Sequence, residues 1–231
     1  MYPIHKILVT HTHWDHAQGI SKFMQLMKDS NIEVLASESG AYNLKYPEKT
    51  NKYYDYNTYP VEEVTPLKEG DIIDLNGLEL EVVNFFGHTM DSIAIVDNKN
   101  QNIIVGDAII DKLDEDAFFT PPMPQDFNEQ ELLKTFEKLR KRRDELNSIS
   151  LAHFGVWKGD HFYQILDEME LLYHKTKESI IQWHNQDLSL EQISEKYYKK
   201  FIPNSKTWNA KLMVFLVEWM IECFKMIGFV K

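Results

Sequence analysis

Three histidines and one aspartate stand close together in THTHWDHAQG, residues 10–19 of a 231-residue chain that has nine histidines in all. The apolar run KILV just before this motif predicts that the chain enters it from a buried strand. Because side chains alternate between the two faces of an extended chain, His11 and His13 point the same way and can share one metal ion. Asp15 and His16 follow where a helical pattern begins, within reach of a second ion. Imidazole and carboxylate ligands fit zinc, iron or manganese, so this spacing favours a metal site over a solvated surface loop.

Three more strand ends offer the remaining ligands. His88 follows the apolar strand expected at 79–86, Asp107 ends IIVGD, and His153 ends SLAH. A single histidine after a strand is more often a packed or surface residue, but a carboxylate among apolar neighbours needs a cation or several donors. Together with the histidine motif, the three residues complete the ligand sets of two metal ions.

These motifs resemble those of the metallo-β-lactamase superfamily, and in particular its glyoxalase II-like hydrolase branch. The match consists of His-x-His-x-Asp-His at 11–16, Gly-His-Thr at 87–89, Gly-Asp at 106–107 and His153, in this order within residues 4–155. The resemblance implies an α/β fold, the αββα sandwich, with the site at one edge between two sheets.

The same resemblance implies one group of ligands for each ion and a shared carboxylate: His11, His13 and His88 for the first ion, Asp15, His16 and His153 for the second, and Asp107 between them. Two divalent ions about 3.5 Å apart, zinc first and iron or manganese as alternatives, would hold a bridging hydroxide that attacks a carbonyl or phosphoryl centre. Asp15 and Asp107 are therefore the candidate catalytic carboxylates. An aspartate at the bridging position resembles thioester, lactone and phosphoester hydrolases more than lactam-cleaving enzymes.

The start of the chain departs from the family pattern. Members usually have extra strands and an Asp-x-Gly turn before the first histidine motif, whereas here only ten residues precede His11. We expect edge strands of the first sheet to be missing. Either the recorded start is too late, or another segment or subunit covers that edge.

Two regions of the chain differ in the spacing of their apolar residues. Residues 1–157 alternate apolar runs with helical patterns, which predicts the α/β catalytic domain, and residues 158–231 read as helices only. We expect strands at 33–37, 79–86, 92–97, 102–107 and 149–154, and an amphipathic helix over 128–147. Ser189 and Gln192 form a capping box that begins a later helix, and Gly228 ends the last one.

Composition and charge restrict the partners. The net charge of −11 argues against a nucleic-acid groove and an anionic membrane surface, and favours a small-molecule substrate. The single cysteine, Cys223, excludes an internal disulfide framework and lies in the wrong element for a nucleophile. With no signal peptide at its start, the chain is predicted to be cytoplasmic.

The last apolar stretch, residues 208–230, resembles a membrane span in hydropathy but carries a narrow charged stripe: Lys211, Glu218, Glu222 and Lys225. A spanning helix would not keep such a stripe, so this segment is predicted to be buried against protein. Its apolar arc is more than one solvent-facing helix exposes: Leu212, Val214, Phe215, Leu216, Trp219, Ile221 and Phe224. We therefore expect a homodimer formed through the C-terminal helices.

Four functions are compatible with these patterns. The first is a hydrolase of a small ester, thioester, lactone or phosphoester. An iron-dependent persulfide-type oxygenase uses part of the same ligand set, and a regulatory or binding protein could retain the metal fold with little turnover. A nuclease fits poorly, because the chain is acidic and only 45 residues separate Asp107 from His153. Tyrosine-rich residues 42–60 and an exposed apolar loop expected at 117–124 would either contact the substrate or pack on the helical region.

Overall fold

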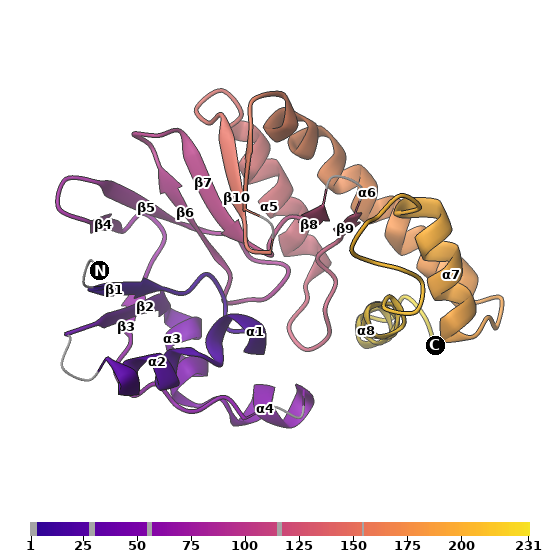
Figure 1. Cartoon of the computed structure of the whole chain (residues 1–231), viewed down its shortest axis with the longest axis horizontal. Helices are drawn as coiled ribbons and strands as arrows, with labels where there is room; N and C mark the ends of the chain where they lie inside the picture. Colours follow the sequence, from indigo (N-terminus) through magenta and orange to yellow (C-terminus); the bar gives the residue numbers. More distant parts are fainter. Residues whose placement is uncertain (1–3, 28–30, 55–56, 115–116, 154) are drawn as a thin grey trace.

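The computed structural model of the chain describes residues 4–27, 31–54, 57–114, 117–153 and 155–231. Two β-sheets face each other, helices cover their outer sides, and further helices follow at the C-terminal end (Figure 1). The chain therefore has the predicted α/β sandwich with a helical C-terminal region.

The first sheet contains three parallel strands in the order β1-β2-β3: β1 is Lys6–Leu8, β2 is Glu33–Ser37 and β3 is Thr65–Leu67. Four helices accompany it: α1 (Trp14–Ala17), α2 (Ile20–Leu26), α3 (Glu38–Lys45) and α4 (Glu48–Tyr54). Side chains of β2 alternate between the two faces of the sheet. Val34 and Ala36 pack with helix residues on one face, whereas Leu35 packs toward the second sheet on the other. Among the described residues β1 pairs only with β2, so it forms one edge of this sheet.

The second sheet has six strands in the order β11-β10-β7-β6-β5-β4. In chain order they are β4 (Ile72–Asp74), β5 (Glu79–Asn84), β6 (Ile93–Asp97), β7 (Asn102–Gly106), β10 (Ser148–Leu151) and β11 (Gly155–Lys158). Neighbouring strands are antiparallel except β7 and β10. Val82 and Ile95 are cross-strand partners that face the first sheet, whereas Val83 and Ala94 face the helices. Both faces of these strands are therefore buried, which explains why their sequences are continuous apolar runs.

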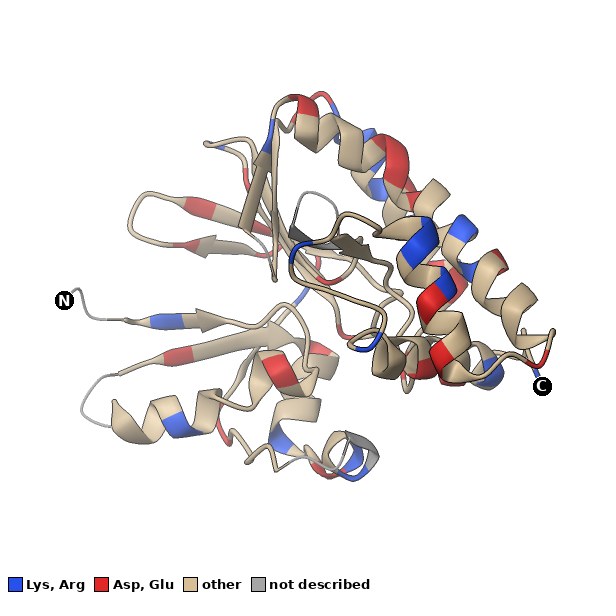
Figure 2. Ribbon diagram, turned by 45° about the vertical axis from the view of Figure 1, so that its right-hand side comes forward, with Lys and Arg blue, Asp and Glu red and all other residues tan. Residues whose placement is uncertain are grey.

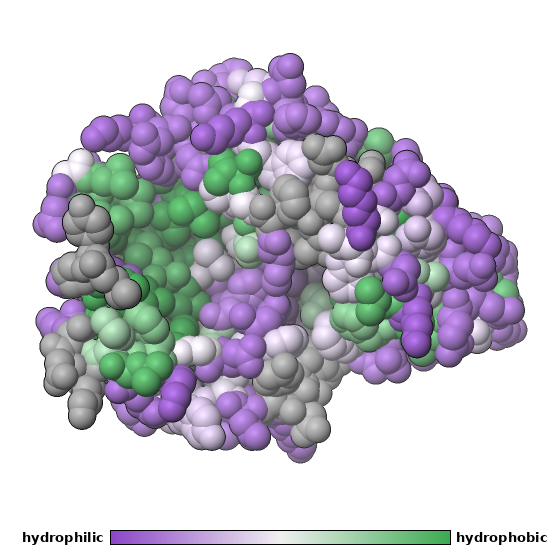
Figure 3. Space-filling model, in the orientation of Figure 1, coloured by the Kyte–Doolittle hydropathy of each residue, from purple (hydrophilic) through white to green (hydrophobic). Residues whose placement is uncertain are grey.

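The space between the two sheets is apolar. Leu35, Leu67 and Ile93 are among the residues buried there. Apolar side chains also surround a hollow that opens beside β1 and β4 in the space-filling view (Figure 3).

Four helices form the remaining layer: α5 is Glu129–Lys141, α6 is Asp160–His184, α7 is Leu190–Phe201 and α8 is Val214–Met226. One hydrophobic cluster joins them to the second sheet, with Phe136, Tyr173 and Phe224 completely buried in it. Charged side chains of both signs lie along these helices (Figure 2). No helix among the described residues is both long enough and apolar enough to cross a membrane.

The predicted helix ends are confirmed in part, since the helix expected over 128–147 spans only Glu129–Lys141. The capping box of Ser189 and Gln192 begins α7, with both of its hydrogen bonds present. The last helix is shorter than predicted and begins at Val214, because the Asn209 side chain accepts hydrogen bonds from the amides of Lys211 and Leu212 and holds a turn there. It ends at Met226, two residues before Gly228.

The loop expected to be exposed at 117–124 is instead mostly buried, and this prediction was wrong. Its first three residues form β9 (Ala117–Phe119), which pairs with β8 (Asp111–Asp114). The Phe119 ring contacts the Trp208 ring with centroids 4.9 Å apart, so the helical region covers the segment. Of the tyrosine-rich stretch, Tyr42, Tyr46 and Tyr59 are exposed, while the side chains of 53–56 lie outside the described residues.

Candidate metal centre

The histidine motif lies where the two sheets meet. After β1 ends, the Val9 amide donates to Leu35 O of the first sheet at 2.8 Å, and the Ile93 amide donates to Thr10 O at 2.8 Å from the second. The loop that carries His11 is thus hydrogen-bonded to both sheets. His13 is the N-cap of α1, which turns Asp15 and His16 back toward the same edge.

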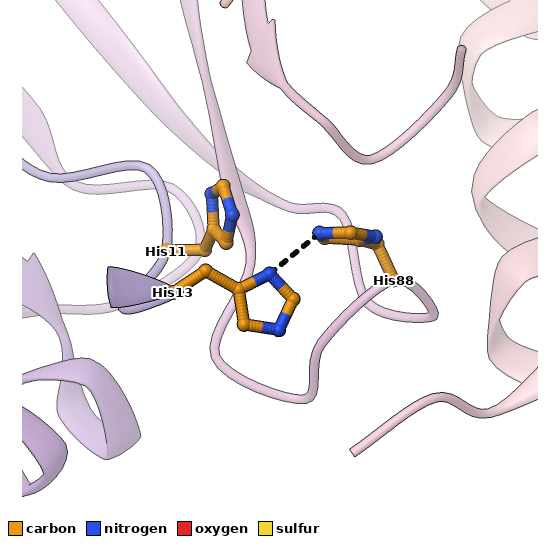
Figure 4. A group of neighbouring side chains, drawn as sticks. All are labelled: His11, His13 and His88. Carbon is orange, nitrogen blue, oxygen red and sulfur yellow. Dashed lines mark hydrogen bonds between the residues drawn. The ribbon is translucent and has the colours of Figure 1, made fainter. Parts of the chain in front are cut away.

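Three histidines form a buried group: His11, His13 and His88, with exposed fractions of 1%, 6% and 3%. Each offers one ring nitrogen, and these nitrogens lie within 4.8 Å of one another. Figure 4 shows the rings converging from two separate loops, with His13 Nδ1 and His88 Nε2 only 2.9 Å apart. The three residues expected to form the first ligand group therefore lie close together.

The protonation of these rings suits a cation. His88 Nδ1 lies 2.7 Å from Pro121 O, and since a carbonyl only accepts, Nδ1 must donate and Nε2 must carry the lone pair. Burial lowers the pKa of all three histidines, that of His13 to about 3, so the rings are neutral at pH 7. His11 Nε2 is buried without a hydrogen-bond partner among the described residues. A divalent ion bound here would accept the lone pair of His88 Nε2 and one ring nitrogen from each of the other two histidines.

The second group contains two carboxylates and two histidines: Asp15, His16, Asp107 and His153, again within 4.8 Å of one another. It is less buried than the first group, with side-chain exposures from 12% to 33%. Its members already interact, because His16 Nε2 and His153 Nε2 lie 3.0 Å and 3.3 Å from Asp107 Oδ2. Asp15 Oδ2 is 3.4 Å from His16 Nε2 and 3.5 Å from His153 Nε2.

Asp107 lies between the two groups. Its Oδ2 is also 3.7 Å from His11 Nε2 and 3.9 Å from His88 Nε2, both in the buried group. Burial would raise the pKa of Asp107, but hydrogen bonds from His153 and His16 outweigh it and hold the pKa well below its usual range. The other oxygen, Oδ1, is buried without a hydrogen-bond partner among the described residues. A buried, ionised carboxylate with an unsatisfied oxygen fits a bridging metal ligand.

The carboxylates of Asp107 and Asp15 also shift the pKa of His16. Burial would lower the pKa of His16, yet the hydrogen bonds to Asp107 and Asp15 raise it to about 10. The imidazolium of His16 thus provides positive charge in the second group when no ion is bound. A divalent cation would replace that charge.

Two glycines set the positions of ligand loops. Gly87 has φ +134°, and a Cβ there would lie 2.4 Å from Leu132 Cα, because α5 packs directly on the loop that carries His88. Gly106 has φ +57°, and a Cβ there would lie 2.7 Å from Thr10 Oγ1. Both glycines stand one residue before a ligand, so each permits the turn that presents it.

A polar network around Asp91 ties the ligand loops together, and the sequence analysis missed it. Thr12, between His11 and His13, donates to Asp91 Oδ2, and Thr89, next to His88, donates to Asp91 Oδ1 at 2.5 Å. The Asn43 side chain of α3 also donates to Asp91 Oδ2, at 3.1 Å. Asp91 is 4% exposed. A carboxylate flanked by Thr89 and Ser92 directly after the Gly-His-Thr motif was the available signal.

The candidate ligands border a cavity of about 260 Å³. Five of the seven lie in its wall: His13, Asp15, His88, Asp107 and His153. The rest of the wall comes from Trp14, from residues 119–123 and from the C-terminal region, including Trp208 and the first turns of α8. The sequence analysis did not place the C-terminal region at the site. Cys223 lies on α8 but not in the cavity wall, and burial raises the pKa of its thiol, so it is no candidate nucleophile.

An αββα sandwich with histidine and aspartate groups at the edge between its sheets defines a class of metal-binding proteins. The model of the metallo-beta-lactamase superfamily matches residues 2–153. The chain belongs to this superfamily.

Curated relatives include proteins named acyl-coenzyme A thioesterase MBLAC2 from Gallus gallus and Homo sapiens, which are 26% and 25% identical to this chain over 114 residues. The aligned part is 45% of this chain and 41% of each relative, so the chain matches less than half of their length.

Solved structures share the fold. The archaeal superfamily protein ST1585 from Sulfolobus tokodaii has a TM-score of 0.64 at 15% identity, over 96% of this chain and 80% of its own. TTHA1429 from Thermus thermophilus has a TM-score of 0.61 at 18% identity, over 97% of this chain and 75% of its own. TTHA1623, solved in a di-iron-bound form, has a TM-score of 0.52 at 19% identity, over 68% of this chain and 73% of its own.

Proposed function

We propose that this protein is a metal-dependent hydrolase that uses two divalent ions and cleaves a thioester. One observation carries the proposal. Seven potential ligands from four separate segments of the chain, with the Asp107 carboxylate between the other six, lie together beside a cavity.

The ligand assignment follows from the two groups. His11, His13 and His88 would hold the first ion, and Asp15, His16 and His153 the second, with Asp107 shared because its Oδ2 lies within 4 Å of members of both groups. Zinc fits this set of nitrogen and oxygen ligands, and iron or manganese are alternatives. When bound, such ions supply a nucleophile at neutral pH and polarise the substrate carbonyl.

The residues of the chain prepare the site for this chemistry. The Pro121 carbonyl fixes the tautomer and orientation of His88. Asp91 holds the loops of His13 and His88 in register through Thr12 and Thr89. The cavity wall is mostly apolar, and a bound substrate that covers it would lower the local dielectric and strengthen electrostatic interactions there.

A thioester is favoured over the other substrates for two reasons. The MBLAC2 relatives are named acyl-coenzyme A thioesterases. In addition, no lysine or arginine lies among the described residues that line the cavity, so nothing but the metal ions would bind a phosphodiester there. The same lack of lysine and arginine disfavours a nuclease.

The persulfide-type oxygenase and the non-catalytic binding protein remain as alternatives. An oxygenase would need only part of the ligand set, whereas here His16 and His153 complete a second group beside the first. A binding protein would bind metal ions but turn over no substrate.

The test is hydrolysis by reconstituted protein. Protein stripped with a chelator and reloaded with zinc, iron or manganese is offered an acyl thioester, a lactone and a phosphodiester, and product release is followed. We expect metal-dependent release of thiol from the thioester, reversed by chelator. Protein that binds two ions but hydrolyses none of the three would instead be a binding protein.

A further inference from the structure

The C-terminal region contributes an apolar wall to the cavity that holds the metal ligands. We define the acyl wall as Trp208, Phe215, Leu216, Trp219 and Met220. Phe119, Pro121, Pro122 and Met123 also line the cavity. His88 and His153 border the same space, so a molecule on this wall reaches the ligand groups without leaving the cavity.

The rings of the acyl wall form a continuous surface. The centroids of Trp208 and Phe215 are 5.9 Å apart, and those of Phe215 and Trp219 are 5.2 Å apart at an interplanar angle of 80°. Phe119 extends the row, 4.9 Å from Trp208. Edge-to-face contacts of this kind hold the rings in place and leave a continuous apolar surface toward the cavity.

Packing within the chain accounts for part of the acyl wall, because Met220 is buried in the main hydrophobic cluster and Trp208 and Leu216 pack against it. Val217, Ile221 and Phe224 anchor helix α8 in the same cluster. Phe215 nevertheless remains 40% exposed. A large aromatic side chain left at the mouth of a cavity marks a surface available to a ligand.

The charges of the cavity lie at one end. Asp15 and Asp107 are the only acidic residues among the described residues of its wall, and both belong to the second ligand group. The acyl wall contains no charged residue. A ligand that fits has an apolar chain for this wall and a reactive polar group for the ligand end.

We propose that the acyl wall binds the aliphatic chain of an acyl thioester, and that α8 thereby sets the chain-length preference of the enzyme. This inference depends on the proposed thioesterase function. The reaction balances as hydrolysis: water forms the new C–O bond, the C–S bond breaks, and the released thiolate takes up a proton, which gives a carboxylic acid and a thiol.

The first test uses a series of thioesters with one thiol and saturated acyl chains from acetyl to decanoyl. Each buried methylene contributes about 0.8 kcal/mol, so kcat/KM is expected to rise about fourfold for each added methylene until the cavity is filled. A flat dependence on chain length in an active enzyme would overturn the inference and leave the proposed function intact. No turnover of any chain by metal-loaded protein would overturn the proposed function.

The second test locates the effect on α8. Phe215→Ala removes a ring from the acyl wall, and we expect the ratio of kcat/KM for decanoyl over acetyl thioester to fall at least about tenfold. Met226→Ala is the matched control, because Met226 lies on the same helix, is 56% exposed and does not line the cavity. An equal ratio in wild type and Phe215→Ala would assign the chain preference to another surface.

The third test needs no turnover. Decanoate is titrated into metal-free protein, and binding is followed by calorimetry and by tryptophan fluorescence, since Trp14, Trp208 and Trp219 line the cavity. We expect decanoate to bind wild type, to bind Met226→Ala equally, and to bind Phe215→Ala several-fold more weakly. If decanoate does not bind, or binds Phe215→Ala as tightly as wild type, the acyl wall is not the binding surface.

Discussion

The two walls of the cavity are built on different principles. On the ligand side, the side chains are positioned by short loops at strand ends or by helix α1, with hydrogen bonds and positive-φ glycines that fix the loops. On the helix side, the acyl wall consists of rings that contact one another on a helix anchored from behind.

This difference separates chemistry from selectivity. Directional contacts on the ligand side fix atoms to within fractions of an ångström, which metal coordination requires. Apolar packing tolerates a change of volume with a graded cost. Substitutions on the ligand side should therefore affect every substrate, and substitutions in the acyl wall should affect only the ranking of substrates.

The largest effect is expected from Asp107→Ala, which removes the carboxylate that both ligand groups share. We expect loss of two-ion occupancy and a fall in kcat/KM of more than about a hundredfold, since even indirect partners of ligands are worth 10- to 100-fold. Metal content is measured by elemental analysis alongside thioester hydrolysis. If Asp107→Ala keeps two ions and wild-type activity, the assignment of the shared ligand is wrong.

A smaller effect is expected from Asp91→Ala, because Asp91 touches the ligand loops through Thr12 and Thr89 but lies in neither ligand group. Metal affinity should fall by about 10- to 100-fold, with activity restored at high metal concentration. Asp91→Asn retains part of the network and should lie between Asp91→Ala and wild type. A titration with zinc that is identical for wild type and Asp91→Ala would show that the network does not position the ligands.

Trp219→Glu tests whether α8 serves the cavity or a dimer interface. The homodimer is still a prediction, although Ile221 and Phe224 of the apolar arc are buried within the same chain. If it forms through α8, wild type is a dimer by light scattering and Trp219→Glu is a monomer or insoluble. If Trp219 serves only the acyl wall, wild type and variant have the same mass, and only the preference for long acyl chains is lost.

The smallest effect is expected from His174→Ala and His184→Ala. Both histidines lie on α6, outside the ligand groups and the cavity wall. His174 makes a 3.7 Å ion-pair contact with Glu170 and a ring contact with Tyr173, and exposed ion pairs contribute little. Metal content and kcat/KM should equal those of wild type within error. A loss comparable to that of Asp107→Ala would mean that a histidine outside the two groups binds metal.

The sequence predicted the ligand side far better than the helix side, for a physical reason. Apolar runs in the sequence predict the strands at 33–37 and 102–107. The histidines and aspartates have a spacing specific enough to be matched to a family motif without a structure. Strands of three or four residues, such as β4 and β9, are too short to produce a periodic pattern.

The role of α8 could not be read from its composition. A helix that is apolar on most of its circumference must be buried, but its pattern does not say whether it faces a core, a second subunit or a cavity. Only the tertiary arrangement places Phe215 and Trp219 beside the metal ligands while Phe224 enters the core. The Asp91 network was missed for the same reason, because it joins residues from three separate segments.

The most direct test of this account is an anomalous diffraction measurement on crystals grown with zinc, with data collected on both sides of the zinc absorption edge. The account predicts two peaks. One lies among His11, His13 and His88, and the other among Asp15, His16 and His153, with Asp107 between them. A single peak in the histidine group would favour mononuclear chemistry, and zinc bound only outside both groups would contradict the account.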